Sequence, residues 1–417
     1  MTLINRFIII INILFNLQSS SLIKSVRRAG AQPNSTIYLR ALFPRWQSER
    51  QFMTATEAGA AFRQLRSGFD TALRPGFSLP RLGGLMSRAL AGTLLDLSEL
   101  TVLTEAATGA YAVTAVLAAM AGARHVYAFT KATRHGTAAD ARQQTLELAD
   151  SVGVADRIDV LEQITPDILQ QTDIVTNSGH LRPLTAALID KLPRDAVIAL
   201  MFETWEFRPE DLDMEACLRR GIPIVGVNER HPSVDVFSFL GPLCVKQLHD
   251  CGLSVYKNRI AVLCDNDFVG SLRAGLANSG ASVDTFDDAQ AMYRDEWDAV
   301  IVALRPAAEP RIGSPEATHL AACVPAGAIV VQFWGDMDRT VLSANGLGVW
   351  PTAPPASGHM GILLSEIGPE PIVRLQAGGL RAAEWVRRSR PVSSDGVAQI
   401  VAQPRSSFRQ FTPDPHR

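Results

Sequence analysis

One stretch of this chain, residues 257–286, constrains the fold more than any other. Residues 257–270 read as a buried strand that enters a tight turn and a helix, and residues 281–286 form the next strand. This order is the βαβ layout of a dinucleotide-binding unit. The glycine fingerprint of such a unit is incomplete, because Asp265 and Asp267 stand at its first two glycine positions and only Gly270 remains. The fold is therefore that of a nucleotide-binding domain, whereas the two carboxylates would repel a pyrophosphate.

Strands alternate with helices along most of the chain. The expected strands of the first half are residues 100–106, 122–129, 157–161, 173–176, 196–202 and 222–227. Those of the second half are residues 260–264, 281–286, 298–303 and 328–333. Strands separated by helices of this length predict parallel sheets. Among these helices, one is expected to be capped by Thr137 and to run to Val152, and one at 211–220 is expected to end at Gly221. The predicted fold class is α/β, with two Rossmann-like, doubly wound parallel-sheet domains at 97–232 and 256–362, joined by a linker at 233–255 in which 233–251 is one long helix.

The remaining segments differ from these domains in composition. Residues 1–52 are predicted to be a leader, either a targeting segment or a stretch outside the mature fold, since the apolar run at 7–17 is too short to span a bilayer. Residues 53–96 are predicted to be a helical and loop extension, and 363–390 a C-terminal helix that packs back. The tail at 391–417 is rich in Ser, Pro and Arg and is predicted to be disordered.

The composition excludes several classes of protein. A net charge of −2 with 20% charged residues is ordinary for a soluble protein and gives no basic excess for nucleic acid. Five scattered cysteines without a CxxC pair indicate reduced thiols and a cytoplasmic location. We therefore expect a small-molecule partner, neither nucleic acid nor a membrane, with a homodimer left open.

Three further phrases occur in a recognisable order. Residues 211–225 are similar to a D-x-x-A-x-x-R-G-I-x-V phrase that precedes a linker helix and a cofactor domain, and residues 331–335 and 357–359 correspond to later N-x-x-R-G and Pro-His phrases. Over about residues 95–385 this order resembles the D-isomer-specific 2-hydroxyacid dehydrogenases, the formate and glycerate dehydrogenase-like family. The resemblance implies an NAD(P)-dependent oxidoreductase that acts on a small anionic substrate in an interdomain cleft, with 97–232 as the substrate-type domain and 256–362 as the cofactor-type domain.

The same resemblance identifies catalytic candidates. The position of the family's catalytic arginine falls on Trp334, and its supporting glutamate has no counterpart between Gly348 and Gly358. His359 stands at the place of the family's acid/base, and a histidine suits proton transfer near neutrality. The alternative is a loop histidine that hydrogen-bonds the backbone. Arg339, five residues after the expected arginine, is a candidate replacement.

The cofactor candidates lie in the second half. If NAD or NADP binds there, Gly270, the glycine for helix–strand packing, and Asp287, just after the second strand, position the cofactor, with Asp287 placed to bind ribose hydroxyls. The alternative for Asp287 is a solvated turn acid. Asp265 and Asp267 have an alternative too, because they would cap the following helix and fill the place of a pyrophosphate.

Polar clusters follow three strands of the first half. Because the carboxyl ends of parallel strands meet at one edge, these clusters are predicted to form a substrate cleft. The residues are Asn177, His180, Glu203, Glu206, Glu229 and His231. Each alone is more often a cap or turn group. No metal is predicted, since no histidine pair has ligand spacing.

The first half also contains a glycine turn. Residues 105–109 look like the glycine-rich turn of methyltransferases, and the next strand ends in Thr130 and Lys131 where an acid would hold a ribose. Lys131, Arg134 and His135 favour an anion at the start of a helix at Thr137, the alternative being a solvated loop. Two further functions stay open: a nucleotide- or S-adenosylmethionine-linked transferase that uses this half, and a non-catalytic ligand-binding or assembly protein that kept the fold.

Overall fold

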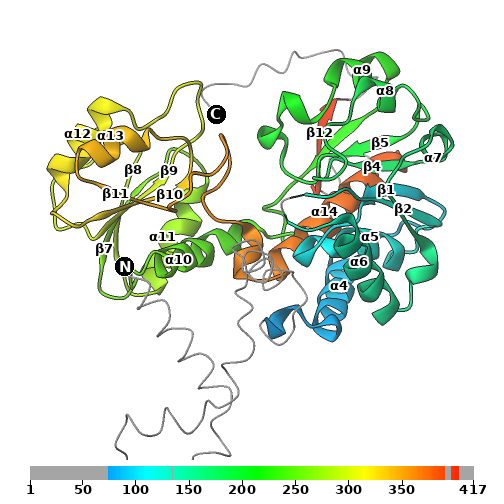
Figure 1. The fold of residues 1–417 in the computed structure, drawn as a ribbon, viewed down its shortest axis with the longest axis horizontal. Helices are drawn as coiled ribbons and strands as arrows, with labels where there is room; N and C mark the ends of the chain where they lie inside the picture. The colour runs from blue at the N-terminus through cyan, green and yellow to red at the C-terminus, as the bar shows by residue number, and fades with distance from the viewer. Residues whose placement is uncertain (1–73, 134, 390–395, 403–417) are drawn as a thin grey trace, which may run out of the picture. The chain divides into compact units, whose positions relative to one another are not determined.

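The computed structural model describes residues 74–133, 135–389 and 396–402, and all of them belong to one compact unit. The predicted leader at 1–52, most of the extension, Arg134 and most of the tail lie outside the described residues. Two sheets of parallel strands with flanking helices make up the described chain, so the predicted α/β fold class is confirmed (Figure 1).

The first sheet has seven strands in the order β12-β6-β5-β4-β1-β2-β3. Their bounds are β1 Thr101–Glu105, β2 His125–Phe129, β3 Ile158–Leu161, β4 Ile174–Thr176, β5 Val197–Ala199, β6 Ile224–Val227 and β12 Ala398–Ala402. All pairs are parallel except β12 with β6. The six parallel strands thus follow the 3-2-1-4-5-6 order of dinucleotide-binding domains, with the switch in direction between β1 and β4.

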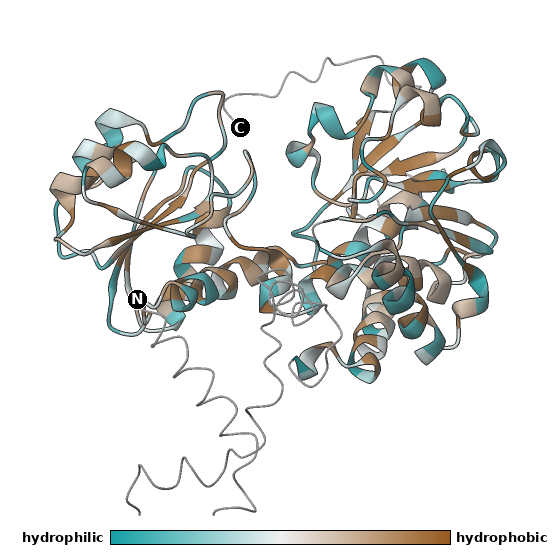
Figure 2. Ribbon diagram, viewed as in Figure 1, coloured by the Kyte–Doolittle hydropathy of each residue, from teal (hydrophilic) through white to brown (hydrophobic). Residues whose placement is uncertain are grey.

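Helices cover both faces of the first sheet. They are α4 Leu79–Thr93, α5 Val113–Met120, α6 Ala138–Ser151, α7 Pro166–Gln170, α8 Ala186–Ile189, α9 Met214–Arg220 and α14 Glu370–Arg387. On one face α4, α5 and α14 pack together over a core that includes Leu82, Val116 and Leu380. Residues of α8 and α9 belong to the core on the other face. The strands between these layers are mostly apolar (Figure 2).

Capping residues explain where some of these helices begin and end. Thr137 caps α6, accepting a hydrogen bond from Asp140 N at 3.1 Å, as the sequence predicted. Asp213 caps α9 in the same way, and Gly221, with a φ of 68°, ends it as predicted.

The second sheet has five parallel strands in the order β11-β10-β9-β7-β8. They are β7 Arg259–Leu263, β8 Ser282–Phe286, β9 Ala299–Ala303, β10 Ile329–Trp334 and β11 Gly348–Trp350. Its helices are α10 Leu240–Asp250, α11 Phe268–Asn278, α12 Ser314–Cys323 and α13 Arg339–Ala344. A Cβ atom on Gly275 would lie 2.4 Å from the Cα of Gly241, so α10 and α11 approach closely where these two glycines meet.

Short 3₁₀ helices complete the described secondary structure. They span Pro75–Phe77, Gly109–Ala112, Ala155–Arg157, Thr204–Glu206, Pro209–Asp211, Phe237–Phe239 and Leu364–Ile367.

Two predictions about the organisation need correction. The linker is not one helix from 233, because Asp235 has a left-handed φ of 49° and the α-helix begins only at Leu240. The tail is not disordered throughout, because residues 398–402 pair with β6 as β12. The two sheets also differ in strand order: the order typical of dinucleotide-binding domains lies in the first sheet, and the 2-1-3-4-5 flavodoxin-like order in the second.

Candidate functional site

Three glutamates meet at the carboxyl edge of the first sheet. Glu203 and Glu206 lie in the loop after β5, and Glu229 lies after β6. The fully buried Glu203 carboxylate accepts the N–H of Glu229 at 3.0 Å and the Nε1–H of Trp205 at 2.5 Å. Glu206 accepts the N–H of Glu203 at 3.3 Å, and its carboxyl group is hydrogen-bonded to that of Glu229. Two of the three predicted strand-end clusters are therefore brought together.

Two members of this glutamate cluster, which consists of Glu203, Glu206 and Glu229, have raised pKa values. Burial is the main cause that raises the pKa of Glu206 to about 7. Burial, followed by the charges of Glu206 and Glu203, raises the pKa of Glu229 well above its ordinary value. Because the two carboxyl groups share a hydrogen bond, they titrate as a pair. Such a pair can accept or release a proton near neutral pH, as general acid–base chemistry requires.

Glu105 and Tyr111 lie at the same edge of the sheet, at and just after the end of β1. The buried Glu105, the last residue of β1, accepts the N–H of His180 at 3.0 Å, and burial raises its pKa. Tyr111 is 37% exposed as a whole residue, but desolvation and then the charge of Glu105 raise its pKa to about 12, so its hydroxyl stays protonated. Sequence reasoning treated Glu105 as a turn residue and missed Tyr111. An acidic residue at the end of an apolar strand was the available signal.

The loop after β4 carries the third predicted cluster. Arg182 Nε donates to the carbonyl oxygen of Asn177 at 3.0 Å, while the buried Nδ2 of Asn177 has no partner among the described residues. His180 Nδ1 lies 3.2 Å from Thr130 Oγ1, and burial, followed by Lys131 and His135, lowers its pKa. A buried donor without an acceptor marks a place where a ligand or water oxygen fits. This loop sits at the switch point between β1 and β4.

Two arginines connect this edge to loops of the second half. Arg230 Nη2 donates to Asp267 at 2.6 Å, and its Nη1 lies 3.6 Å from Glu203. Arg208 Nη1 lies 2.5 Å from His359 Nε2, where a guanidinium donor requires the imidazole nitrogen to accept. His359, the predicted acid/base, is therefore next to the loop that carries Glu206.

Aromatic rings accompany these contacts. The half-exposed Trp205 ring lies 5.2 Å from the ring of Trp334, centroid to centroid, and 6.1 Å from that of Phe268. Trp334, at the position where the resemblance places an arginine, donates its Nε1–H to the carbonyl of Gly358 at 3.1 Å. The tryptophan thus packs and orients the loop of His359 instead of supplying a charge.

The turn after β7 does not have the predicted arrangement. Asp265 accepts the N–H of Arg305 at 2.8 Å and pairs with Arg311 at 2.7 Å. Burial opposes ionisation there, but these two bonds lower the pKa of Asp265. Asn266, not Asp265 or Asp267, caps α11 by accepting the N–H of Phe268 at 3.1 Å, so the predicted aspartate cap is wrong.

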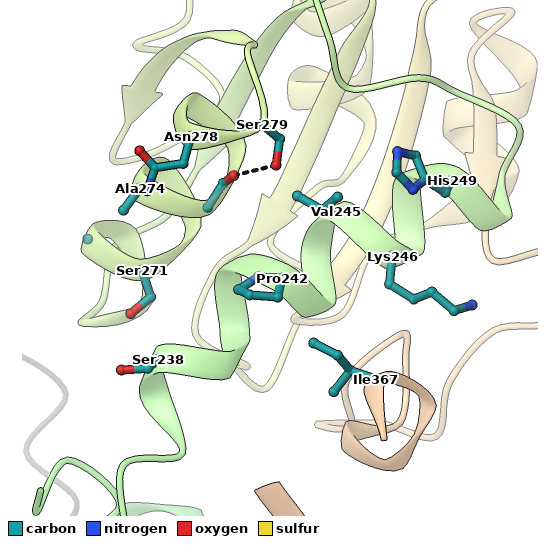
Figure 3. A pocket seen from close by; sticks show the side chains of 12 residues that line it. Ser238, Pro242, Val245, Lys246, His249, Ser271, Ala274, Asn278, Ser279 and Ile367 are labelled. Carbon is teal, nitrogen blue, oxygen red and sulfur yellow. Dashed lines mark hydrogen bonds between the residues drawn. The ribbon is translucent and has the colours of Figure 1, made fainter. Parts of the chain in front are cut away.

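Gly270 does not serve helix–strand packing either. A Cβ atom there would meet nothing within 4 Å. Gly270 lies on the exposed side of α11, in a groove of about 670 Å³ that Lys246 and His249 of α10 and Asn278 of α11 also line (Figure 3). None of the other predicted site residues lines this groove.

The remaining candidates have local partners. Arg339 donates to Gln332 Oε1 at 3.2 Å and to the carbonyl of Pro351 at 2.5 Å, which fastens the loop after β11. His231 Nδ1 lies 2.8 Å from Ser233 Oγ, and Asp287 is exposed after β8.

The start of α6 was predicted to bind an anion. Asp140 accepts both the N–H and the hydroxyl of Thr137 at 2.8 Å, so a carboxylate already occupies this place and the prediction is wrong there.

Neither a metal centre nor a membrane span is visible in the described part of the chain. No group of three or more His, Cys, Asp or Glu side chains there is arranged to hold a metal ion. No helix among these residues is both long enough and apolar enough to cross a bilayer.

No protein-family model matches the chain, and no curated protein matches it. Similar solved structures include the NAD-dependent formate dehydrogenase of Staphylococcus aureus in complex with NAD, at 10% identity and a TM-score of 0.44 over 73% of this chain and 99% of that one. They include the A chain of dipicolinate synthase from Bacillus subtilis, at 10% identity and a TM-score of 0.47 over 71% and 99%. A third is the 3-phosphoglycerate dehydrogenase of Entamoeba histolytica with NAD+ bound, at 10% identity and a TM-score of 0.39 over 70% and 97%.

These neighbours include dehydrogenases of the kind that the order of sequence phrases resembles. At such identities and TM-scores they assign no activity to this chain. Its chemistry has to be argued from its own residues.

Proposed function

We propose that this chain is an NAD(P)-dependent oxidoreductase that acts on a small anionic substrate, with its reacting groups at the carboxyl edge of the first sheet. The observation that carries this proposal is the glutamate cluster: two buried carboxyl groups and a partly buried one, Glu206, whose pKa is about 7, lie at the strand ends where α/β sheets bind ligands. The adjacent Arg208 and His359 supply a cation and an imidazole for the substrate.

The two sheets differ in how well they suit the cofactor. In the second, Asp265 and Asn266 already occupy the turn after β7, so a pyrophosphate does not fit there. In the first, Gly109 has a φ of 64° and makes the tight turn after β1 that such a cofactor needs. Its N–H donates to Gln144 Oε1 at 2.8 Å, and an amide side chain can turn its NH₂ group toward a phosphate. The residues of the first sheet therefore fit the cofactor.

The polar groups at this edge are then assigned roles in proton transfer and in substrate binding. Bound NAD(P)H would supply a hydride to the carbonyl carbon of a 2-oxo acid, and bound NAD(P)+ would accept it back in the reverse reaction. The Glu206–Glu229 pair would give a proton to the carbonyl oxygen in the first direction and take it back in the second. Arg208, beside His359, attracts the substrate anion, and Tyr111 remains a hydrogen-bond donor because its pKa is raised.

The first experiment is a binding test followed by an activity test. We expect NADH or NADPH, but not S-adenosylmethionine, to bind in isothermal titration calorimetry. Oxidation of the bound nucleotide would then be followed with a panel of small 2-oxo acids. Glu206→Gln should lower the rate by about 10²- to 10⁴-fold, because it removes the proton-carrying group. The neighbouring, exposed Glu210 gives the matched control, Glu210→Gln, which should retain the rate.

Other results would point elsewhere. Binding of S-adenosylmethionine alone would favour the transferase. The absence of any nucleotide binding would favour a non-catalytic ligand-binding protein, a candidate supported by the ion pair that fills the turn after β7.

A further inference from the structure

We propose that the loop after β2, with Lys131 and His135, binds the 2′-phosphate that distinguishes NADP(H) from NAD(H). This inference rests on the proposed function and goes beyond it by choosing between the two nucleotides. It is carried by the position of the loop in the sheet, by its contacts with the glycine turn and by its charge.

The position comes from the strand order. β2 lies beside β1, with Phe129 opposite Glu105, so the two strands end at the same level. In sheets of this order the residue at the end of the second strand, about 20 residues after the glycine turn, binds the adenosine ribose. An acid there binds the free 2′-hydroxyl, whereas a basic residue nearby accommodates a 2′-phosphate. This chain has Thr130 and Lys131 at that place.

Contacts join the loop to the glycine turn. Thr108 Oγ1 donates to the carbonyl of His135 at 3.4 Å. A Cβ atom on Gly136 would lie 3.0 Å from Thr108 Cγ2, so the two segments pack tightly. Gln144, from the helix that follows the loop, accepts the N–H of Gly109. The turn that would hold the pyrophosphate and the basic loop are therefore one continuous surface.

The loop carries basic side chains, as the binding of a negatively charged phosphate requires. Lys131 is exposed, and its Nζ donates to the carbonyl of Arg182 at 3.1 Å, which keeps the ammonium group near the strand ends. Lys131 and His135, after burial, lower the pKa of His180, as expected where positive groups gather. Asp140, the carboxylate beside the loop, is bonded by Thr137 at the start of α6, where the helix dipole offsets its charge.

The test compares four ligands by isothermal titration calorimetry. We expect NADPH to bind at least about tenfold more tightly than NADH, a difference of about 1.4 kcal/mol. Adenosine 2′,5′-bisphosphate should likewise bind more tightly than adenosine 5′-monophosphate. The NADPH preference should shrink at high salt, because the loop is exposed.

Variants of the loop test whether Lys131 causes the preference for NADPH. Lys131→Glu should abolish the preference for NADPH and leave NADH binding within about twofold. Lys191→Glu reverses an exposed charge at another place and should keep the preference. If Lys131→Glu lowers the melting temperature strongly, His135→Ala provides a second variant, which should reduce the preference.

Three outcomes would overturn the inference. Equal affinity for NADPH and NADH would refute it while leaving the proposed function intact. No binding of either nucleotide would refute both. Inorganic phosphate that stabilises the protein as much as the bisphosphate does would show a general anion site with no role for the adenosine.

Discussion

Both sheets consist mainly of parallel strands with flanking helices, but the polar side chains at the carboxyl ends of their strands differ. At the carboxyl edge of the first sheet, burial holds carboxyl groups such as Glu206 near the point of half-protonation. At the edge of the second, Asp265 is matched by Arg311 and by a backbone N–H, so its polar atoms are satisfied. Titratable groups with strongly shifted pKa values are common at functional sites, whereas buried polar groups with all their hydrogen bonds made are typical of structural regions. The contrast teaches that two sheets of similar build can differ in their strand ends: carboxyl groups with raised pKa values lie at the first sheet, and a carboxylate with a lowered pKa lies at the second.

Gly275→Val should give the largest effect. A side chain there meets the backbone of Gly241, so we expect a loss of about 3 kcal/mol or more in the free energy of unfolding, measured by urea denaturation. Gly270→Ala, on the same helix but facing open space, should change it by less than about 1 kcal/mol. Equal losses would mean that the second sheet does need its fingerprint glycine.

Asp265→Ala should have the next largest effect. The change leaves the N–H of Arg305 and the guanidinium of Arg311 without their acceptor, at a cost of about 2 kcal/mol. Asp287→Ala, at an exposed position, should cost less than about 0.5 kcal/mol. Thermal and urea denaturation measure both. A gain in NADH affinity on loss of Asp265 would place the cofactor at the second sheet and reverse the contrast.

The pH dependence of stability tests the first sheet. Because the folded protein raises the pKa of Glu206 from 4.5 to about 7, it holds the proton in this window while the unfolded chain releases it. The stabilisation is complete below the unfolded value and is lost as the pH rises through about 7. Glu206 keeps some contact with water, so we expect a discounted effect of about 1–2 kcal/mol.

The matched variants are Glu206→Gln and Glu210→Gln, denatured at about pH 5 and pH 8. Only the first should flatten the fall in stability with rising pH. A wild-type slope in the Glu206 variant would show that the cluster is ionised in the folded protein.

Asp267→Asn should give the smallest effect. The bond between Arg230 and Asp267 links loops of the two sheets, but the side chains are 43% and 65% exposed. Exposed pairs contribute about 0–1 kcal/mol, so the melting temperature should hardly move. A loss above about 2 kcal/mol would show that this link, and not the separate cores, holds the two sheets.

Local features of the fold, such as the ends of helices, could be predicted from the sequence. Thr137 and Gly221 act through residues within four positions, so their capping patterns were enough. Strand order is set by how the crossovers fold back, which no local pattern encodes, and so the different orders of the two sheets were not predicted.

Only part of the candidate site could be predicted from the sequence. The strand-end rule brought Glu203 and Glu229 together, because it depends on strand direction alone. It did not foresee that Arg311, 46 residues away in the chain, would neutralise Asp265. The apolar strand before Glu105 was the one sequence signal of its burial, and its raised pKa was not predicted from that signal.

The position of α14 and β12 in the chain has a consequence for biosynthesis. Both complete the first sheet, yet the ribosome makes them only after the whole second sheet. Until α14 emerges, the apolar surface that it covers on β4, β5 and β6 has no permanent partner. Residue Gln399 of β12, which accepts the N–H of Thr204 at 3.0 Å beside Glu203, arrives among the last described residues. A nascent chain therefore lacks part of this edge until α14 and β12 have been made, and a ribosome that stalls in the second sheet leaves an aggregation-prone intermediate with exposed apolar surface.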